Sequence, residues 1–373
     1  MNNKFKINLT LSWLSYSEIY DISTYENMVK YFHGVENIWD DFDKEASKIK
    51  FINESTVKRL RFKKKNFKQK FCDDIKKYDF TIINLYDEEY PEALKYIANP
   101  PYILYAQGDM SLLKKQAIAI VGSRKATSYG KYCAKKFSEE LVKRGIVIIS
   151  GMASGIDGIA HRAALTNKGR TIGVIASGLN INYPQSNKKV YDSMRQSQGL
   201  IISEFYFDTP PLKYNFPLRN RIISGLSDGL LVIEAAKSSG TLITAGYAAE
   251  QGKTVFAVPG NIDSLFSVGT NMLIRDGAKL VLSIEDILEE LEFVDWTNID
   301  HENRVEKNKI EYVKNLNEIQ VQIMNLLLKK SMTINDISNK IPCDANELLS
   351  NITLLELQNY VYLDNNNVFA NIT

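Results

Sequence analysis

Runs of serine and glycine follow four of the apolar segments of this sequence, and these residue types can bind phosphate groups. The runs are Gly122-Ser123-Arg124, Ser150 to Gly155 (with Gly151 and Ser154), Ser177-Gly178, and Ser238 to Thr241 (with Ser239, Gly240 and Thr241). Small side chains let backbone N–H groups approach an anion closely, and the start of a helix adds partial positive charge. One such run alone is typical of a tight turn. Four of them on one edge of a sheet would form a wall for several phosphates.

A second group of residues combines cations with an aromatic ring. Within nine residues the chain carries Lys213, Phe216, Arg219, Asn220 and Arg221. We expect them in a loop after the apolar run Leu200 to Ile202, a loop that also contains Pro210 and Pro211. Cations neutralise backbone phosphates, and an aromatic face stacks on an unpaired base, which contributes ~1–3 kcal/mol per base. Duplex DNA hides its base faces, so this combination favours single-stranded DNA. The structural alternative is that Phe216 lies in the core and that one arginine pairs with a nearby acid such as Glu234.

Sequence patterns of catalysis and of cofactor binding are missing from the chain. It has no G-x-x-x-x-G-K-[ST] run, and Gly122, Gly151 and Gly155 do not form a G-x-G-x-x-G pattern. The three cysteines and three histidines are scattered, so we expect no metal site. Asp157 and His161 share a helix face at i and i+4, which we interpret as a helix cap hydrogen-bonded to the histidine. We therefore predict no cofactor and no catalytic activity.

Composition restricts the possible partners. The chain has 373 residues, of which 45% are hydrophobic and 24% charged, as in a globular protein of two or three domains. Its net charge is only +2, so a nucleic-acid partner requires a local basic patch. The most basic stretch, Lys58 to Lys70, is either a solvated helix face or an auxiliary nucleic-acid patch. No stretch approaches the ~18 apolar residues of a membrane span, and we expect a cytoplasmic protein without membrane contact.

The apolar runs themselves predict the element that would hold these loops. They are Ala117 to Val121, Ile146 to Ile149, Thr171 to Ile175, Leu200 to Ile202, Leu230 to Ile233 and Thr254 to Val258. Amphipathic stretches of helical spacing alternate with them. This alternation indicates an α/β fold, with a Rossmann-like doubly wound parallel sheet covered by helices on both faces. Ligands bind outside the carboxyl ends of the strands in such sheets, where the serine and glycine runs lie.

The sequence divides into four predicted parts. Residues 1–79 form a small all-helical domain, residues 80–291 the sheet domain, residues 292–315 a polar linker, and residues 316–373 a winged helix-turn-helix domain. In this last part, no Lys or Arg lies between Asp344 and Tyr360, whereas acids do. An acidic helix is repelled by phosphate, so we expect it to contact protein rather than DNA.

These features together resemble the DprA/Smf family, the DNA-processing proteins of bacterial transformation. The resemblance is dense from about Phe80 to Leu291 and loose outside that range. The stretches that carry it are Val121 to Arg124, Ser150 to Asp157 with Ala160-His161, Ala176 to Leu179 with Tyr183-Pro184, Phe216 to Gly225, Ile233 to Leu242, Phe256 to Gly260 and Gly269 to Ala278.

The resemblance implies an extended Rossmann fold that binds single-stranded DNA and loads a RecA-type recombinase onto it during natural transformation and recombination. By similarity, Arg124, Lys213 and Phe216 lie in the DNA groove, with Arg219 and Arg221 nearby. The family also forms homodimers through the end of the Rossmann domain. In this chain that interface would involve Asn271, Ile274 and Leu280.

Two other functions are compatible with a fold of this class. A nucleotide-monophosphate hydrolase of the lysine-decarboxylase-like type has a related fold and a Gly-Gly-x-Gly-Thr loop followed by a glutamate. Here the loop is Ser238 to Ala245, and Leu242 to Tyr247 offers no acid. A ligand-sensing transcription regulator would need a helix that reads DNA, and the acidic helix of the tail argues against it.

Overall fold

The structure, a computed structural model, describes residues 3–291, 316–327, 332–358, 360–364 and 367–370. The chain forms two compact units, Met1–Val294 and Asp295–Thr373, which are described separately below. The predicted linker, residues 292–315, lies outside the described residues. Within the described ranges, no helix is long and apolar enough to cross a membrane.

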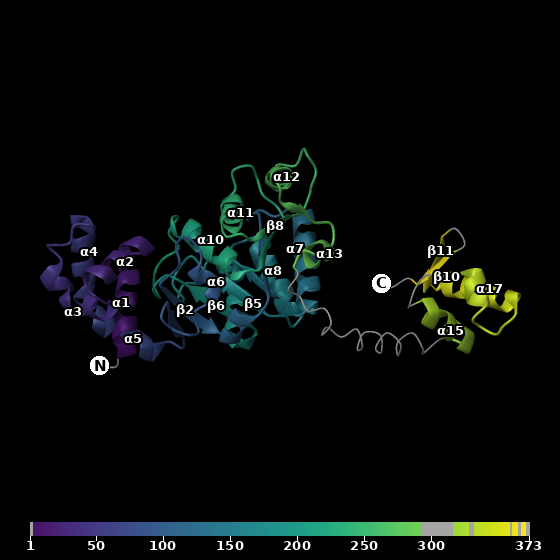
Figure 1. Ribbon diagram of the computed structural model, residues 1–373, viewed down its shortest axis with the longest axis horizontal. Coiled ribbons are helices and arrows are strands. Elements are labelled where there is room, and N and C mark those ends of the chain that lie inside the picture. The colour runs from purple at the N-terminus through teal and green to yellow at the C-terminus, as the bar shows by residue number, and fades with distance from the viewer. Residues whose placement is uncertain (1–2, 292–315, 328–331, 359, 365–366, 371–373) are drawn as a thin grey trace. The chain divides into compact units, whose positions relative to one another are not determined.

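Five helices begin the first unit and pack beside one edge of its sheet (Figure 1). They are α1 (Asn3–Tyr16), α2 (Ile22–Tyr31), α3 (Val35–Glu45), α4 (Glu54–Lys64) and α5 (Phe67–Lys77). Asp21 and Asn53 begin α2 and α4, because their side chains accept hydrogen bonds from the Thr24 and Thr56 N–H groups. The fully buried Trp13 belongs to an apolar core that also includes side chains of the sheet domain. A domain boundary at residue 79 stays a prediction.

A nine-stranded sheet forms the centre of the first unit. Its strands are β1 (Thr81–Asn84), β2 (Ile103–Gly108), β3 (Ala117–Val121), β4 (Val147–Ser150), β5 (Thr171–Val174), β6 (Gly199–Ser203), β7 (Gly229–Val232), β8 (Thr254–Ala257) and β9 (Lys279–Leu280). The order is β1-β2-β6-β5-β4-β3-β7-β8-β9. All pairs from β6 to β9 are parallel, whereas β2 pairs antiparallel with both β6 and β1. The predicted α/β fold with a largely parallel sheet is confirmed.

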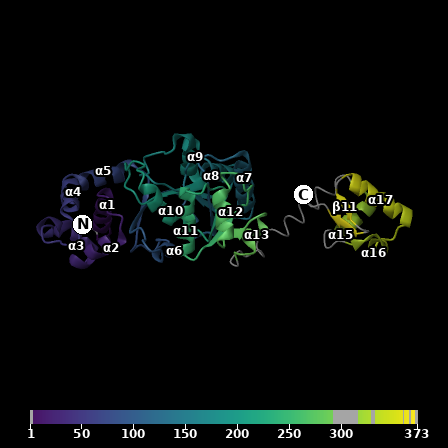
Figure 2. The ribbon, with the colours of Figure 1, turned by 90° about the horizontal axis from the view of Figure 1, so that it is seen from above.

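Helices cover both faces of this sheet. They are α6 (Glu92–Lys95), α7 (Ser128–Lys143), α8 (Ile156–Thr166), α9 (Lys188–Ser193), α10 (Asn215–Leu226), α11 (Gly240–Glu250), α12 (Val268–Arg275) and α13 (Glu285–Leu288), with short turns at Met110–Lys114, Gln185–Asn187 and Met194–Gln198. Viewed from above, α7, α8 and α9 lie on one side and α10 and α11 on the other (Figure 2). Successive side chains of β3 point to opposite faces of the sheet. Ile118 and Ile120 pack with α7 and α8 on one face, and Ala119 and Val121 pack with α10 and α11 on the other.

The strand order creates a switch point in the middle of the sheet. From β3 the chain moves outward through β4 and β5 to β6, and then returns to β7 on the other side of β3. The loops that leave β3 and β7 therefore diverge to opposite faces. In open α/β sheets, this divergence opens the crevice in which ligands bind.

The second unit contains three helices and a small sheet. These are α15 (Glu318–Leu327), α16 (Ile334–Ser338) and α17 (Ala345–Leu357), with β10 (Met332–Thr333), β11 (Val361–Asp364) and β12 (Asn367–Ala370) in the order β10-β12-β11. Asp344 caps α17 by accepting from the Asn346 and Glu347 N–H groups at 2.8 and 2.9 Å. Buried side chains of all three helices, such as Ile323, Ile337 and Leu348, share one core. The winged-helix assignment stays a prediction.

Candidate nucleic-acid interface

A pocket of about 330 Å³ lies at the switch point, between the loops after β3 and β7 and the start of α10. Its lining includes nine of the predicted binding residues: Gly122, Ser123, Arg124, Phe216, Arg219, Asn220, Ser239, Gly240 and Thr241. Three segments that are far apart in the sequence thus meet at one surface. Of the four predicted serine and glycine runs, those after β3 and β7 line the pocket together with the start of α10, and the run after β4 contributes Ala153.

Glycine at position 155 lets the loop after β4 pack closely against the loop after β3. Gly155 has a φ of +77°, and a Cβ atom there would lie 2.2 Å from the Ser123 carbonyl oxygen. The next N–H group, of Ile156, donates to the same oxygen at 3.2 Å. This close approach fixes the backbone of the Gly122 to Arg124 loop at the pocket wall.

The start of α11 forms another wall. Ser239 is the N-cap, and its hydroxyl accepts from the Thr241 N–H at 3.1 Å. A Cβ atom on Gly240 would meet nothing within 4 Å, so the backbone at this helix start is open to a ligand. The partial positive charge of a helix N-terminus favours an anion at this place.

The segment from Lys213 to Arg221 is largely helical, whereas the sequence analysis treated it as a loop. Helix α10 begins at Asn215, whose amide donates to the Ala176 and Pro210 carbonyls at 3.1 and 3.3 Å. Pro217 falls in the first turn, where a missing N–H group costs no hydrogen bond. Pro217 is therefore compatible with the start of this helix, and Pro210 and Pro211, the prolines of the predicted loop, precede it.

Three side chains form what we call the pocket rim: Arg124, Lys213 and Phe216. The guanidinium carbon of Arg124 lies 4.8 Å from the centroid of the Phe216 ring, a cation–π arrangement. Arg124 and Lys213 are exposed, and neither forms an ion pair within the described part of the chain. Lys213 lies outside the pocket itself, two residues before α10 begins. The rim therefore offers two free cations and a partly covered ring.

Arg219 lines the pocket but is held by the protein. Its Nη1 donates to the Gly151 carbonyl at 2.6 Å and also to the Val174 carbonyl. Burial lowers the pKa of Arg219 to about 10, while the nearby Asp157 opposes that shift. With two carbonyls already bound, Arg219 supports the pocket floor and has limited freedom to reach a phosphate. Gly151, also predicted as a binding residue, lies buried beneath the pocket as its partner.

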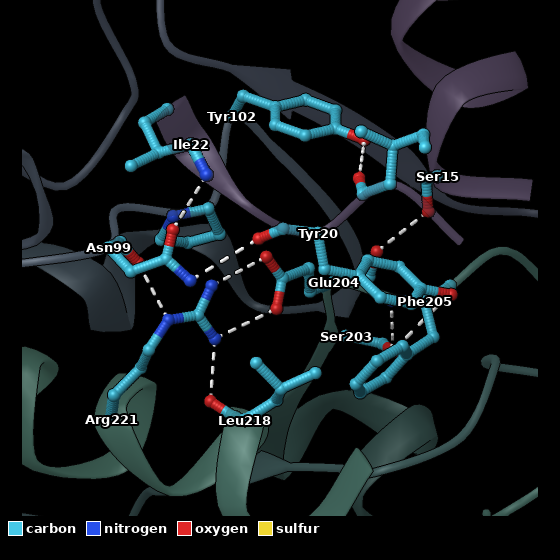
Figure 3. Close-up of polar contacts among 12 residues, drawn as sticks. Ser15, Tyr20, Ile22, Asn99, Tyr102, Ser203, Glu204, Phe205, Leu218 and Arg221 are labelled. Carbon is cyan, nitrogen blue, oxygen red and sulfur yellow. Dashed lines mark hydrogen bonds and ion pairs between the residues drawn. The ribbon is translucent and has the colours of Figure 1, made fainter. Parts of the chain in front are cut away.

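Arg221 points away from the pocket, and its predicted place beside DNA is corrected by the structure. Its side chain is 4% exposed and forms a two-pronged ion pair with Glu204, with N–O distances of 2.6 and 2.9 Å (Figure 3). Its Nε also donates to the Asn99 carbonyl at 2.6 Å. The sequence alternative of an arginine paired with an acid thus applies to Arg221, but the acid is Glu204. Glu234, suggested from the sequence, instead accepts from the N–H and hydroxyl of Thr127.

Ser154 and the Ser177-Gly178 run, which were both predicted to face a phosphate, lie away from the pocket. Ser154 is half-buried and does not line the pocket. The Ser177-Gly178 run follows β5, which is separated from β3 by β4. A Cβ atom on Gly178 would lie 2.1 Å from the Phe207 carbonyl oxygen, so this glycine permits a close backbone contact within the fold. The run thus serves as a tight turn, the alternative stated for a single loop.

Asp157 and His161 do not bond to each other. Asp157 accepts from the Gly151 and Ala153 N–H groups at 3.2 and 3.4 Å, and burial raises its pKa. His161 Nδ1 lies 2.7 Å from the Thr171 hydroxyl, and burial lowers the pKa of His161 to about 3. The expected hydrogen bond between the two was wrong, because the imidazole is directed toward β5 instead.

The residues predicted for a dimer interface lie at the opposite end of the sheet from β1. The Asn271 amide on α12 bonds both the Gly260 N–H (3.2 Å) and carbonyl (2.9 Å), so it shapes the loop before α12. Ile274 is half-buried at the end of α12, and Leu280 is 40% exposed on the edge strand β9. Two exposed apolar side chains, Ile262 and Leu265, lie in the segment between β8 and α12.

Sequence reasoning missed several residues at the pocket. Lys125, Ile243 and Phe266 are among the further residues that line it. Tyr183 was also missed, although its ring lies 5.9 Å from that of Phe216, edge to face, and is 43% exposed. No spacing in the sequence links Tyr183 to Phe216. Among the described residues, no group of three or more His, Cys, Asp or Glu side chains could hold a metal ion.

Known proteins are similar to this chain in sequence and in fold. The family model of DNA recombination-mediator protein A matches residues 81–292. The chain is 48% identical over 210 residues to the DNA processing protein DprA of Bacillus subtilis, which covers 56% of this chain and 70% of that protein. It is 44% identical over 214 residues to DprA of Streptococcus pneumoniae, and this match covers 57% of this chain and 75% of that protein.

Solved structures agree. The X-ray structure of DprA from Streptococcus pneumoniae matches with a TM-score of 0.65 and 35% identity, over 79% of this chain and 99% of that one. DprA from Helicobacter pylori, described for its single-stranded DNA binding mode, matches with a TM-score of 0.52 and 34% identity, over 58% and 96%. The matched family region includes the whole pocket, from β3 to α12. By its sequence and its fold, the chain belongs to the DNA recombination-mediator protein A family.

Proposed function

We propose that this protein binds single-stranded DNA at the pocket and its rim. The observation that carries the proposal is the exposed Arg124 guanidinium against the Phe216 ring, at the switch point of the sheet. A cation and an aromatic face together suit a phosphate and an unpaired base. The name of the Helicobacter pylori relative, which refers to single-stranded DNA binding, supports the same ligand.

The pocket's own chemistry agrees with binding rather than reaction. The family is one of recombination mediators and not of enzymes, as predicted. The start of α11 carries hydroxyl and N–H groups toward the pocket, and from Leu242 to Tyr247 that helix has no acid that could serve as a general base. This is the position at which the hydrolase alternative needs its glutamate.

Further parts of the proposal concern partners. We place the protein in the cytoplasm, as a homodimer through Asn271, Ile274 and Leu280, loading a RecA-type recombinase onto single-stranded DNA during natural transformation. The exposed Leu280 on an edge strand supports the dimer, because a self-complementary apolar patch suits two-fold pairing. Membership of a recombination-mediator family supports the recombinase.

A strand-preference assay tests the central claim. Fluorescence anisotropy would compare a labelled single-stranded oligonucleotide with the matching duplex at several salt concentrations. We expect markedly tighter binding of the single strand, and a salt-dependent affinity because phosphates are neutralised. Equal affinity for both forms, or binding of neither, would refute the proposal.

A further inference from the structure

An exposed aromatic side chain lies among cations on helix α4, well away from the sheet. Phe62 is 75% exposed, although it is a large apolar residue. Lys58 and Arg59 precede it by one helical turn and Lys65 follows it by about one turn, so these side chains are its neighbours on the surface. Lys65 is exposed and forms no ion pair within the described ranges. The arrangement repeats the chemistry of the pocket rim.

The acids near this face leave it cationic. Lys58 pairs with Glu54 at 2.8 Å, but both side chains are largely exposed, and such pairs are weak and easily exchanged. By contrast, Lys63 and Lys64, on the inner side of α4, are held by Glu18 and Asp43 at 3.1 and 2.7 Å. The inner cations are therefore structural, whereas Lys58 and Lys65 are exposed and Arg59 is half-buried.

Helix α4 adjoins the segment that leads into α10. Glu18 accepts from Lys63 of α4, and it also lies beside the exposed Tyr214, the residue that precedes α10. Partial burial and Glu18 raise the pKa of Tyr214, and the charge of Arg59 on α4 opposes that shift. The connection is rigid, because the preceding segment packs on the N-terminal helices.

Several contacts give this packing its rigidity. The Tyr206 hydroxyl donates to Asp74 of α5 at 2.7 Å, and Lys70 of α5 pairs with Asp208 at 2.9 Å. The Tyr20 ring lies 5.0 Å from that of Phe205. The N-terminal helices and the segment from Phe205 to Asp208, which leads toward α10, are thus packed together.

We propose that single-stranded DNA leaving the pocket continues over this surface onto α4, with Phe62 as a further stacking platform and Arg59 and Lys65 as phosphate contacts. The proposal rests on the proposed function of the pocket. Along this path lie Arg124 against the Phe216 ring, the exposed sequence neighbours Lys213 and Tyr214, and Arg59 one helical turn before Phe62. Successive unpaired bases stack on such rings without regard to sequence, whereas a duplex offers no base faces to them.

An acidic protein segment is the competing occupant of a basic face. Continuity with the pocket favours DNA, because the three cation–aromatic pairs lie on connected elements. Phe62 also favours DNA, because an acidic peptide bound by charge alone has no use for an exposed ring. A comparison of DNA lengths distinguishes the two occupants, because only DNA that is long enough to reach both the pocket and α4 gains affinity from α4.

The test compares a short oligonucleotide of about 6 nucleotides with one of about 30, lengths on either side of common site sizes. We expect Phe62→Ala to weaken binding of the long strand about 5-fold or more and to leave the short strand unchanged. Lys65→Ala should lower the salt slope for the long strand alone, by between about 0.7 and 1. Anisotropy titrations on the full-length chain give both quantities.

Two matched variants serve as controls. Tyr96→Ala removes a ring that is 79% exposed and lies on the far side of α10, where the neighbouring Leu94 and Ile97 side chains contact Gly225. Lys143→Ala removes an exposed cation at the end of α7. Neither should change either affinity, and all four variants should keep the wild-type midpoint of thermal unfolding.

The outcomes are distinct. Wild-type affinity of Phe62→Ala and Lys65→Ala for the long strand would overturn the path over α4 while leaving the pocket intact. An equal loss for both lengths, or for the matching duplex, would overturn it as well. Failure of the wild-type chain to bind any single strand would instead refute the proposed function of the pocket.

Discussion

The pocket rim and the layer buried beneath it contain similar side chains but use them in opposite ways. On the rim, Arg124 and Lys213 are exposed and free of ion pairs among the described residues. In the buried layer, Arg219 under the pocket and Arg221 on the opposite side of α10 are 4% and 3% exposed and are saturated by carbonyls and by Glu204. The rim can exchange its partners for DNA, whereas the buried layer cannot without losing stability.

This difference shows that the type of a residue alone does not identify it as a binding residue. Arg219 and Arg221 are two residues apart on α10, so they point to opposite sides of the helix. One reaches the pocket floor and the other the contact with the N-terminal helices. The Glu204 backbone accepts from Ser15 of α1 at 2.9 Å, so this ion pair links α10 to the N-terminal helices (Figure 3).

Breaking the buried layer should have the largest effect. Arg221→Ala leaves Glu204 charged and without its partner inside the protein, and removing one member of a buried pair costs about 3–5 kcal/mol. We expect a loss of that size in the free energy of unfolding, measured by urea denaturation. At temperatures where the variant is folded, its salt slope for single-stranded DNA should equal that of the wild type.

A double variant is the control for this prediction. Arg221→Met with Glu204→Gln removes both charges, so most of the lost stability should return. If Arg221→Ala were as stable as the wild type, the ion pair would not hold α10. If the salt slope fell by about one, Arg221 would be a DNA contact after all.

A buried histidine, His161, should also make the stability of the protein depend on pH. The folded protein keeps the pKa of His161 at about 3 because of burial, whereas an unfolded chain has the ordinary value near 6.5. Between these values the unfolded chain takes up the proton and the folded one does not. His161 should therefore cost no stability above about pH 6.5, and about 2 kcal/mol at pH 5.

Urea denaturation of the wild type and of His161→Asn at pH 7 and pH 5 measures this difference. Other groups titrate equally in both proteins, so the comparison isolates the imidazole. We expect the free energy of unfolding to fall less in the variant on acidification. The same fall in both proteins would show that His161 accepts a proton without leaving its buried place.

The rim should show smaller effects, confined to binding. Phe216→Ala removes a stacking surface and should weaken single-strand binding by ~1–3 kcal/mol with little change in salt slope, since stacking releases no counterion. Arg124→Ala should lower that slope by between about 0.7 and 1, and Lys213→Ala likewise. An unchanged slope in both cation variants would place the DNA elsewhere, and unchanged unfolding in all three is the control.

The fold was more predictable than the site. Continuous β-branched runs from Ala117 onward indicated the parallel sheet, because strands buried on both faces lack polar alternation. The order of those strands was not predictable, and it decides which loops meet. The runs after β3 and β7 meet at the switch point, but Ser177-Gly178 lies two strands away.

The direction of individual side chains was also beyond the sequence. The cations of the Lys213 to Arg221 segment are close in the chain, and a loop would have let all of them face the same ligand. Because the segment is helical from Asn215, they separate around its axis. Tyr183 approaches Phe216 only because the loop after β5 folds back, a contact that has no signal in spacing.

The short strand β9 restricts how copies of this chain could associate. The other edge of the sheet, β1, is flanked by the N-terminal helices, where the Asn84 amide donates to Asn8 of α1 at 2.8 Å. β9 has only two residues, Lys279 and Leu280. Long exposed edges template open-ended strand addition, and short charged ones resist it. An edge of this length can guide the pairing of two molecules, yet it is too short to propagate a fibre.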